Sequence, residues 1–584
     1  MNRLSLAVIS ALALSTFTFA SNLVKVEFKD ISVPTTDKQK REVRATNQVN
    51  INGKKYKIGY HTILRSGQDV GDNIFGLIYD TDGKPITEKD GSLMISNSND
   101  FSSLLPVGKK LFMVSHFESR PAAIYVTELK QDKNGNLHAI STKNVDFSAY
   151  GGLWVPCAGS RTPWNTHLGS EEYEPNAAKV KPNGSINPYY DAMADYYGGD
   201  LKKLNPYDYG WITEVKILNE NGDVKASKHY AMGRFSHELA YVMPDKRTVY
   251  FGDDGTNTAL FMFIADKPAD LSSGTLYAAK WIQTSAKNGG SAKLKWISLG
   301  HATDSEVREA LDKKYRFTDI FESIKPDGST PPKGFSSIHA SGGHEWLKIK
   351  PDMEKVASRL EARRYAAIKG ATTEFRKMEG ITYNSNKNEL YVDISSIGKS
   401  MEDNMKKGKP NNKYDIGGNN DIRLPYNPCG GVYKLQLSNQ FGSKYVAKDM
   451  KALVVGSTKG DTNKFNKCDL NSLANPDNIS YMKNTDILLI GEDTGSGHQN
   501  DFVWAYNLSK NKLTRIETTP YGSETTSVYS YNNVNGHGYI MSVVQHPYGE
   551  GDAVTKEADM PKKAKNPNDM HAYTGYIGPL PVIK

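Results

Sequence analysis

The sequence predicts an all-β protein, a six-bladed β-propeller with long loop and helical insertions. Helical periodicity is scarce, whereas short runs rich in Val, Ile, Tyr and Phe alternate with Asn, Asp, Gly and Lys along the chain. This pattern is typical of strands and turns. One unit also recurs six times, and its shortest interval, from position 477 to position 524, is about the length of one four-stranded blade.

Each repeated unit starts with an acid or a thiol and contains two apolar runs joined by a polar turn. In one copy, Glu238 precedes an apolar run, and the second run, Val249-Tyr250-Phe251, ends in Gly252-Asp253-Asp254. The six copies start at Asp100, Cys157, Glu238, Glu379, Asp477 and Glu524. Because innermost strands of a propeller line its central channel, we expect these residues to converge around the axis. The alternative is that unrelated hairpins look alike, but hairpin packing alone does not require an acid or a thiol at one position six times.

The N-terminus has the pattern of a secretory signal peptide. A short basic start, Met1-Asn2-Arg3, precedes an apolar run from Leu4 to Phe19 and a small residue, Ala20. We therefore expect residues 1–20 to be removed and residues 21–584 to form a single β-propeller catalytic domain that is periplasmic or secreted. No later stretch supplies the about 20 apolar residues of a membrane helix, so we expect no stable membrane insertion.

The composition is that of an ordinary globular protein. The 584 residues include 73 Lys+Arg and 65 Asp+Glu, a net charge of +8, and 38% hydrophobic residues, which argues against intrinsic disorder and a disulfide-dense scaffold. Basic residues occur in short runs such as Lys406-Lys407, so no nucleic-acid partner is expected. Helical spacing predicts helices over 305–314 and 352–368, and we expect insertions near 176–230 and 265–375.

Three cysteines are informative in an exported chain. Cys429 and Cys468 lie in Gly/Asn-rich segments and could pair in an oxidising compartment. Cys157 would then remain alone. It is either a buried, inert thiol or, because it starts a repeated unit, a metal ligand.

The repeat argument brings many carboxylates to one mouth. Eleven acids are expected there: Asp100, Glu171, Glu172, Glu238, Asp253, Asp254, Glu379, Asp477, Glu492, Asp493 and Glu524. So many like charges cannot share one site ionised without cations. Oxygen ligands in this number favour Ca²⁺, and the thiolate of Cys157 suits a softer or redox-active ion such as iron or zinc. The sequence thus predicts several calcium ions and at least one transition metal.

A polymetal site of this kind favours an anionic, oxygen-rich substrate, and phosphate esters fit best. A basic side chain is then expected against the charge that develops on the phosphoryl oxygens. Arg376 is the first candidate, followed by Arg161 and Arg234. Three histidines near the motifs, His116, His237 and His546, are either ligands or structural residues.

Several motifs resemble those of the PhoX-type alkaline phosphatases. The segment Cys157-Ala158-Gly159-Ser160-Arg161-Thr162-Pro163-Trp164, which runs into Glu171-Glu172, looks like the family signature. Further similar motifs are Gly233-Arg234-Phe235-Ser236-His237-Glu238, Asn475-Pro476-Asp477-Asn478, Gly522-Ser523-Glu524-Thr525-Thr526 and Gln545-His546-Pro547. The His-Glu pair expected after the first hairpin is His116-Phe117-Glu118.

The resemblance implies an exported, monomeric phosphomonoesterase that acts on small phosphate esters at an iron–calcium cluster bridged by oxide. Carried over residue by residue, it gives the Fe³⁺ ligands as Cys157, Glu238 and Asp253 or Asp254. It gives the residues that hold Ca²⁺ or bridge as Glu171, Glu172, Glu379, Asp477 and Glu524. We assign Arg376, Glu379 and Cys157 to catalysis.

Two other functions share some of these features. A calcium-dependent propeller hydrolase of a lactone or phosphodiester would have the acidic mouth but no use for Cys157. A non-catalytic, metal-stabilised propeller would bind a partner through its long insertions.

Overall fold

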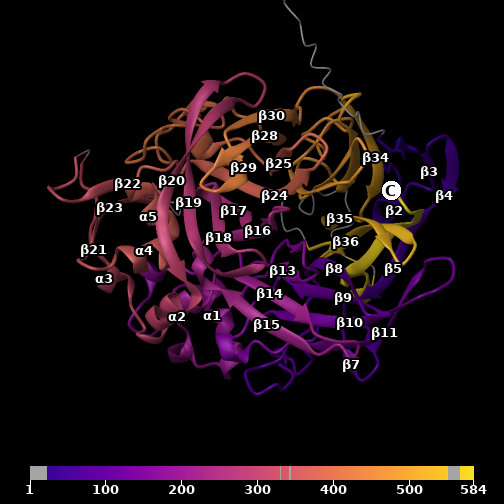
Figure 1. Cartoon of the computed structure of the whole chain (residues 1–584), viewed down its shortest axis with the longest axis horizontal. Coiled ribbons are helices and arrows are strands. Elements are labelled where there is room, and N and C mark those ends of the chain that lie inside the picture. Colours follow the sequence, from indigo (N-terminus) through magenta and orange to yellow (C-terminus); the bar gives the residue numbers. More distant parts are fainter. Residues whose placement is uncertain (1–22, 329, 341–342, 550–563, 565) are drawn as a thin grey trace, which may run out of the picture.

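The described part of the chain is mostly β-sheet. The computed structural model describes residues 23–328, 330–340, 343–549, 564 and 566–584 (Figure 1), so the expected signal peptide at 1–20 lies outside them. The α-helices of these residues are α1 (Pro188–Asp191), α2 (Asp304–Asp312), α3 (Phe317–Ile320), α4 (Glu354–Leu360) and α5 (Ala362–Ile368). In this part of the chain no helix has the length and apolar character needed to cross a bilayer.

The first two large sheets each have four strands. The first, in the order β11-β10-β9-β8, consists of β8 (Asn99–Val107), β9 (Lys110–Phe117), β10 (Ala123–Gln131) and β11 (Leu137–Asn144). The second, in the order β12-β13-β14-β15, consists of β12 (Ser160–Arg161), β13 (His167–Gly169), β14 (Ile212–Ile217) and β15 (Val224–His229). All pairings in both sheets are antiparallel, as expected for chain segments joined by hairpins.

The next two repeated units share a ten-stranded sheet. Its strands are β16 (His237–Val242), β17 (Thr248–Thr258), β18 (Phe261–Lys267), β19 (Asp270–Ser285), β20 (Ser291–Thr303), β24 (Phe375–Asn384), β25 (Glu389–Ile394), β28 (Gly431–Gln440), β29 (Ser443–Ala447) and β30 (Asp449–Val455). The units join because β20 pairs with β30 and β17 pairs with β24. Because these two units form one sheet, strand pairing does not divide them into two separate blades. The predicted number of six blades therefore stays a prediction.

N-terminal strands complete the last two large sheets. In the order β2-β34-β33-β32-β31, the strands are β2 (Arg44–Ala45), β31 (Pro476–Tyr481), β32 (Ile487–Glu492), β33 (Phe502–Asn507) and β34 (Lys512–Thr518). In the order β35-β36-β37-β5, they are β5 (Gly59–Arg65), β35 (Glu524–Val534), β36 (His537–Gln545) and β37 (Tyr573–Pro581). Antiparallel pairing of β5 with β37 ties the two ends of the described chain together.

Smaller sheets lie in the connections. One contains β1 (Val26–Phe28), β3 (Gln48–Ile51) and β4 (Lys54–Lys57), and another contains β21 (Phe321–Ile324), β22 (Ser336–Ala340) and β23 (Gly343–Ile349). Two-stranded hairpins are formed by β6 (Asp69–Val70) with β7 (Asn73–Ile74) and by β26 (Met405–Lys406) with β27 (Lys409–Pro410).

The first strands of the six repeated units contact one another in a closed order. β8 lies against β12, and the contacts continue through β16, β24, β31 and β35, which again lies against β8. Apolar side chains fill the space between consecutive sheets, as for Phe112 with Val215 and for Leu489 with Ile540. Figure 1 shows β8, β16, β24 and β35 nearer the middle of the molecule than β11, β20 and β30. The start of each unit is therefore brought close to the start of the next.

The predicted helices form with small changes. Thr303 caps α2 through a capping box with Glu306. The helix predicted over 352–368 forms as two, α4 and α5, because the backbone of Glu361 leaves helical geometry (φ −132°, ψ 48°). The segment 176–230, expected to be an insertion, includes β14 and β15, which are the outer strands of the second sheet.

Candidate metal centre

Four of the acids that start the repeated units lie at irregularities of strand pairing. The register shifts between Asn99 and Ser102 in β8 and between His237 and Ala240 in β16, next to Asp100 and Glu238 respectively. Equivalent shifts flank Glu379 in β24 and Asp477 in β31. A bulge interrupts the alternation of side chains and redirects one of them. The same local distortion therefore aims one carboxylate per unit toward the shared centre.

The unit starts converge on a continuous cluster of possible ligands. Within each of four overlapping groups, one ligand atom per residue lies within 4.8 Å of the others. The groups are Asp100–Glu118–Cys157, Cys157–Glu172–Glu238, Glu238–Glu379–Asp477 and Asp477–Asp493–Glu524. We call these nine residues the ligand cluster. It brings together seven of the eleven predicted acids, the predicted thiol and one carboxylate that was not in the predicted ligand set.

Cys157 has the surroundings of a ligand. Its thiol is free and buried, and Sγ lies 3.2 Å from Oε1 of Glu238 and 3.9 Å from Oδ2 of Asp100. Burial, followed by the nearby carboxylates, raises the pKa of the Cys157 thiol well above its ordinary value. A positive ion would reverse this effect, because coordination favours the thiolate.

His116 positions the loop that carries Cys157. Its Nε2 bonds the carbonyl of Cys157, and its Nδ1 lies 3.1 Å from Nε2 of His167, whose Nδ1 lies 2.8 Å from Oγ of Ser103. Burial lowers the pKa of His116 to about 3, so the ring is neutral. If Nε2–H of His116 donates to the carbonyl, then His167 donates to Nδ1 of His116 and Ser103 donates to His167. Both nitrogens of His116 are thus engaged, which leaves this side chain no role as a ligand.

Several residues near the cluster have a strained backbone conformation. Positive φ angles occur at Val155 (39°), Tyr173 (47°), Lys377 (47°), Asn475 (45°) and His546 (33°). The value at Val155 is unusual because a β-branched side chain is rarely accepted in this region. Such conformations cost about 1–3 kcal/mol each and gather at functional sites.

Burial and mutual repulsion disfavour the ionised carboxylates. The pKa values of Asp100, Glu118, Glu172, Glu238, Glu379, Asp477 and Glu524 are all raised, first by burial and then by neighbouring charges. For Glu379 the pKa rises to about 7. These groups can be ionised together at neutral pH only if cations lie among them.

Lys377 supplies one positive charge. Its Nζ lies 3.1 Å from Oε1 of Glu379 and 3.4 Å from Oδ2 of Asp254. Burial alone would lower the pKa of Lys377, but these two carboxylates hold it well above its ordinary value. Asp254 also accepts a hydrogen bond from the hydroxyl of Tyr173 (2.6 Å). Asp254 is therefore at the edge of the cluster through Lys377, although it is not one of the nine residues.

The donor set fits bound metal ions. One lysine cannot balance eight clustered carboxylates and a thiol. In addition, Oδ1 of Asp100 and Oδ1 of Asp254 are buried and have no hydrogen-bond partner among the described residues. Buried polar atoms normally have partners, so these oxygens are available to coordinate a cation.

Three predicted acids have structural partners outside the cluster. Glu171 pairs with Nζ of Lys228 at 2.8 Å, and Asp253 pairs with Nη2 of Arg363 at 2.7 Å. Glu492 accepts hydrogen bonds from Nε1 of Trp504 (2.7 Å) and from the backbone of Ala474 (2.9 Å).

These three acids share one feature, which is that each precedes a second acid in the sequence. Neighbouring side chains at the end of a strand point to opposite sides. The second acids are Glu172, Asp254 and Asp493, and they face the centre while their predecessors pack between sheets.

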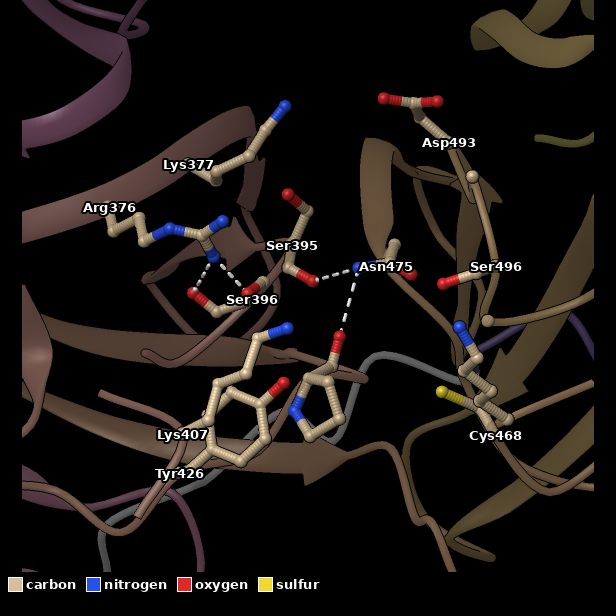
Figure 2. A pocket seen from close by; sticks show the side chains of 14 residues that line it. Arg376, Lys377, Ser395, Ser396, Lys407, Tyr426, Cys468, Asn475, Asp493 and Ser496 are labelled. Carbon is tan, nitrogen blue, oxygen red and sulfur yellow. Dashed lines mark hydrogen bonds between the residues drawn. The ribbon is translucent and has the colours of Figure 1, made fainter. Parts of the chain in front are cut away.

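Of the predicted arginines, Arg376 lines a pocket beside the ligand cluster, whereas Arg234 bonds backbone groups. Arg376 lines a pocket of about 340 Å³ that also includes Lys377 and Asp493 (Figure 2). Its guanidinium donates to the carbonyl of Ser396 (3.3 Å) and to the Ser396 hydroxyl. Arg234 instead donates to backbone carbonyls, including that of Tyr209 (2.7 Å), and is structural.

The remaining predicted side chains lie in different settings. Arg161 bonds Asn165 (Nε to Oδ1, 3.0 Å), and Nε2 of His237 bonds the carbonyl of Gly233 (2.9 Å). Nδ1 of His237 is buried without a hydrogen-bond partner among the described residues, but His237 is not one of the nine residues of the ligand cluster. His546 does lie at the cluster, with Nε2 3.4 Å from Oε2 of Glu524.

Two residues of the centre were missed as site residues, Glu118 and Lys377. Glu118 follows β9 directly and accepts a hydrogen bond from Nε2 of Gln545 (2.6 Å). Its place after the second strand of a unit matches that of Glu172 and Asp493, and the motif His116-Phe117-Glu118 noted in the sequence already contained it. Lys377 carries no comparable signal, because a lysine between Arg376 and Glu379 reads as an ordinary surface residue.

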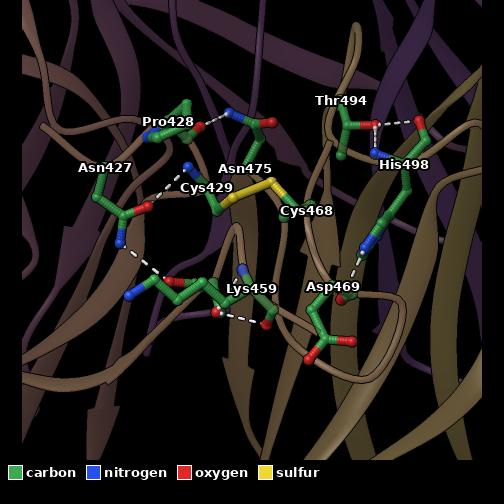
Figure 3. Close-up of a disulfide and its surroundings, with 12 residues drawn as sticks. Asn427, Pro428, Cys429, Lys459, Cys468, Asp469, Asn475, Thr494 and His498 are labelled. Carbon is green, nitrogen blue, oxygen red and sulfur yellow. Dashed lines mark hydrogen bonds between the residues drawn. A yellow bond between two sulfur atoms is a disulfide. The ribbon is translucent and has the colours of Figure 1, made fainter. Parts of the chain in front are cut away.

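The predicted disulfide is present. Cys429 and Cys468 are bonded, with Cα atoms 6.0 Å apart, and Cys157 is the free cysteine (Figure 3). Cys468 also lines the pocket of Arg376. The disulfide therefore fixes one wall of that pocket.

Known proteins with similar sequence or structure include alkaline phosphatases. A family profile described as "Alkaline phosphatase PhoX" matches residues 121–547. The solved structure of Pseudomonas fluorescens PhoX in complex with vanadate, a transition state analogue, is similar at 17% identity over 95% of this chain and 98% of that one, with a TM-score of 0.58. A putative 6-phosphogluconolactonase from Bacteroides fragilis (12% identity, 86% and 97% covered) reaches only 0.29, which is too low to indicate a shared fold. No curated relative matches by sequence.

Proposed function

Because the chain belongs to the PhoX family of alkaline phosphatases, we propose that it hydrolyses phosphate monoesters to inorganic phosphate in a metal-dependent reaction. The observation that carries this proposal is the position of the ligand cluster beside a cationic pocket. Asp493 belongs to both, and Arg376 and Lys377 line the pocket on the side of Glu379. A phosphate group at this junction would meet positive charge from both directions.

The ligand cluster would hold several Ca²⁺ ions and one Fe³⁺. Cys157 and Glu238 would bind iron, since the thiol offers the soft ligand that calcium does not use. Asp254 would be the further iron ligand, because Asp253 is engaged by Arg363. Glu172, Glu379, Asp477, Asp493 and Glu524 would hold calcium or bridge, and Asp100 and Glu118 would complete the cluster on the side of Cys157.

Bound metal ions would neutralise the phosphate, orient it and supply a nucleophile derived from water. The side chains of this chain would do the rest. Arg376 and Lys377 would bind the non-bridging oxygens and oppose the charge that grows on them. Glu379 would keep Lys377 in place, and the pocket beyond Arg376 would hold the alcohol part of the ester.

The fold and location belong to the same proposal. Six blades would surround one axis in a single domain over residues 21–584, supported by the closed order of contacts among the first strands. Residues 1–20 would direct export, and the disulfide supports a periplasmic or secreted protein because such bonds persist in oxidising compartments. The protein would act as a monomer on small phosphate esters.

Release of phosphate from p-nitrophenyl phosphate tests the proposal. We expect hydrolysis with Ca²⁺, its loss in EGTA, and a decrease of about 10²–10³ in kcat for Arg376→Gln. Arg161→Gln is the matched control, since Arg161 bonds Asn165 away from the ligand cluster, and it should retain wild-type activity. A metal-loaded protein that cleaves a lactone or a phosphodiester but no monoester would refute the proposal in favour of another hydrolase, and one that cleaves none of them would indicate a binding protein.

A further inference from the structure

The pocket beside the ligand cluster contains two groups of cations. Lys377 pairs with Glu379 and Asp254, and Arg376 precedes it in β24. Lys407 (Figure 2) and Lys467 also line the pocket. On the basis of the proposed phosphatase function, we propose that Lys407 and Lys467 form a second anion subsite. It would favour phosphate monoesters whose alcohol part carries a carboxylate or another phosphate.

The backbone holds Lys407 at the tip of a hairpin. Lys407 and Gly408 connect β26 to β27 with φ angles of 54° and 71°, as in a type I′ turn. Both of their N–H groups donate to the carboxylate of Glu402, at 2.8 and 2.7 Å. Asn, Asp or Gly is preferred at the first of these positions. A lysine there accepts backbone strain, which favours a role for its side chain in the pocket.

The backbone of Lys467 is held by neighbouring loop residues. Its N–H donates to the carbonyl of Ser496 (3.2 Å), and the next N–H, from Cys468, donates to that of Gly497 (3.0 Å). Cys468 is also bonded to Cys429 (Figure 3). Two backbone hydrogen bonds and the disulfide of the next residue therefore hold the backbone of Lys467 in place. The loop is already ordered when the side chain of Lys467 contacts a ligand.

The charge balance of the pocket favours a second anion. Within the described ranges neither Lys407 nor Lys467 has an ion-pair partner, although many lysines elsewhere do, such as Lys280 with Asp421 at 2.7 Å. Asp493 is the acidic residue of the lining, and it belongs to the ligand cluster. Hydroxyl and amide groups of Ser395, Ser396, Ser496 and Asn475 complete a polar wall. The volume of about 340 Å³ suits a small ester.

Two matched substrate pairs test the subsite. 3-Phosphoglycerate and glycerol 3-phosphate differ by a carboxylate, and fructose 1,6-bisphosphate and fructose 6-phosphate differ by a phosphate. An exposed ion pair shifts an equilibrium by up to about fivefold, so two lysines together predict a kcat/KM ratio of up to about 25-fold for the more anionic member at low ionic strength. The carboxylate and phosphate pairs show which second anion is preferred, and added NaCl should reduce the ratio.

Charge-neutral variants assign the effect to these lysines. In Lys407→Gln/Lys467→Gln the ratio should fall to about one, mainly through KM. Lys406→Gln/Lys459→Gln removes the same charge from neighbouring positions outside the pocket lining and should keep the ratio. Equal ratios in wild type and the Lys407/Lys467 variant, or no preference in wild type, would overturn the subsite while the phosphatase function stands. Hydrolysis of none of the four esters would overturn both.

Discussion

Glu171 and Glu172 are adjacent, yet the structure gives them opposite roles, and separate substitutions to Gln distinguish them. Glu171 accepts from Lys228 at 2.8 Å and from the N–H groups of Gly210 (3.0 Å) and Trp211 (3.1 Å). Glu172 is in the ligand cluster with Cys157 and Glu238. We therefore expect Glu171→Gln to reduce stability and Glu172→Gln to reduce metal content.

The magnitudes follow from the two environments. Glu171→Gln leaves the ammonium of Lys228 buried without its counter-charge, since the side chains of both residues are 0% exposed. Loss of one partner of a buried pair costs about 3–5 kcal/mol. Glu172→Gln instead removes one charge from a group whose ligand atoms lie within 4.8 Å of one another. At an effective dielectric constant of about 20, repulsion between two unit charges 4.8 Å apart is worth about 3.5 kcal/mol, and more at shorter distances, so the metal-free variant should be at least as stable as metal-free wild type.

Elemental analysis, denaturant titration and phosphate release measure all three consequences. Glu171→Gln should retain its metals and most of its activity once folded, whereas Glu172→Gln should lose bound metal and at least about 10²-fold in activity. In EGTA, Glu171→Gln should be the less stable of the two variants, because it alone leaves a buried ammonium without its counter-charge. Metal loss in Glu171→Gln with unchanged stability, or full metal content in Glu172→Gln, would refute the assignment from side-chain alternation.

Three further predictions concern the thiol, the cations and a buried histidine. Cys157→Ala should lose the transition metal and the activity but keep part of its calcium by elemental analysis, and an active variant with unchanged metals would contradict the ligand role. EGTA should lower the melting temperature, and Ca²⁺ should restore it. Mg²⁺ should restore it poorly, because Mg²⁺ demands octahedral geometry. A metal-free protein that refolds to the same stability would argue against a charged cluster. Although burial opposes the charged form, the carboxylates of Asp304 and Glu214 raise the pKa of His229 to about 10. Its contribution to stability should be complete below the ordinary pKa of 6.5 and should be lost as pH rises through about 10. Unfolding measured from pH 6 to 10.5 should show this decline in wild type and less of it in His229→Gln.

The repeat in the sequence located residues that the structure brings close together. Asp100, Glu238, Glu379 and Asp477 could be located because each occupies the same offset in a repeated pattern, and all four are in the ligand cluster. The sequence allowed Cys429 and Cys468 to pair in an oxidising compartment, and the structure shows that they do.

Features that depend on tertiary contacts could not be predicted in this way. Adjacent acids look equivalent in a sequence, so Glu171, Asp253 and Glu492 were expected to be ligands, and only their packing against other sheets reveals their partners. The joining of two units into one ten-stranded sheet depends on the long β19–β20 hairpin, which reaches β30. The length of this hairpin in the sequence does not reveal that β20 pairs with β30.

The centre depends on how closely the first strands approach one another, and glycine makes this approach possible. A Cβ at Gly380 would lie 2.7 Å from the carbonyl oxygen of Asp477 and 2.8 Å from the backbone nitrogen of Ile479. A Cβ at Gly252 would collide with the carbonyl oxygen of Glu379. Each glycine therefore lies where one ligand-bearing strand passes directly over the backbone of another. A methyl group at either position would force the strands apart and separate ligand atoms that now lie within 4.8 Å. The bulges aim the carboxylates, but the bare glycine backbone is what allows ligand atoms of Glu238, Glu379 and Asp477 to lie within 4.8 Å of one another.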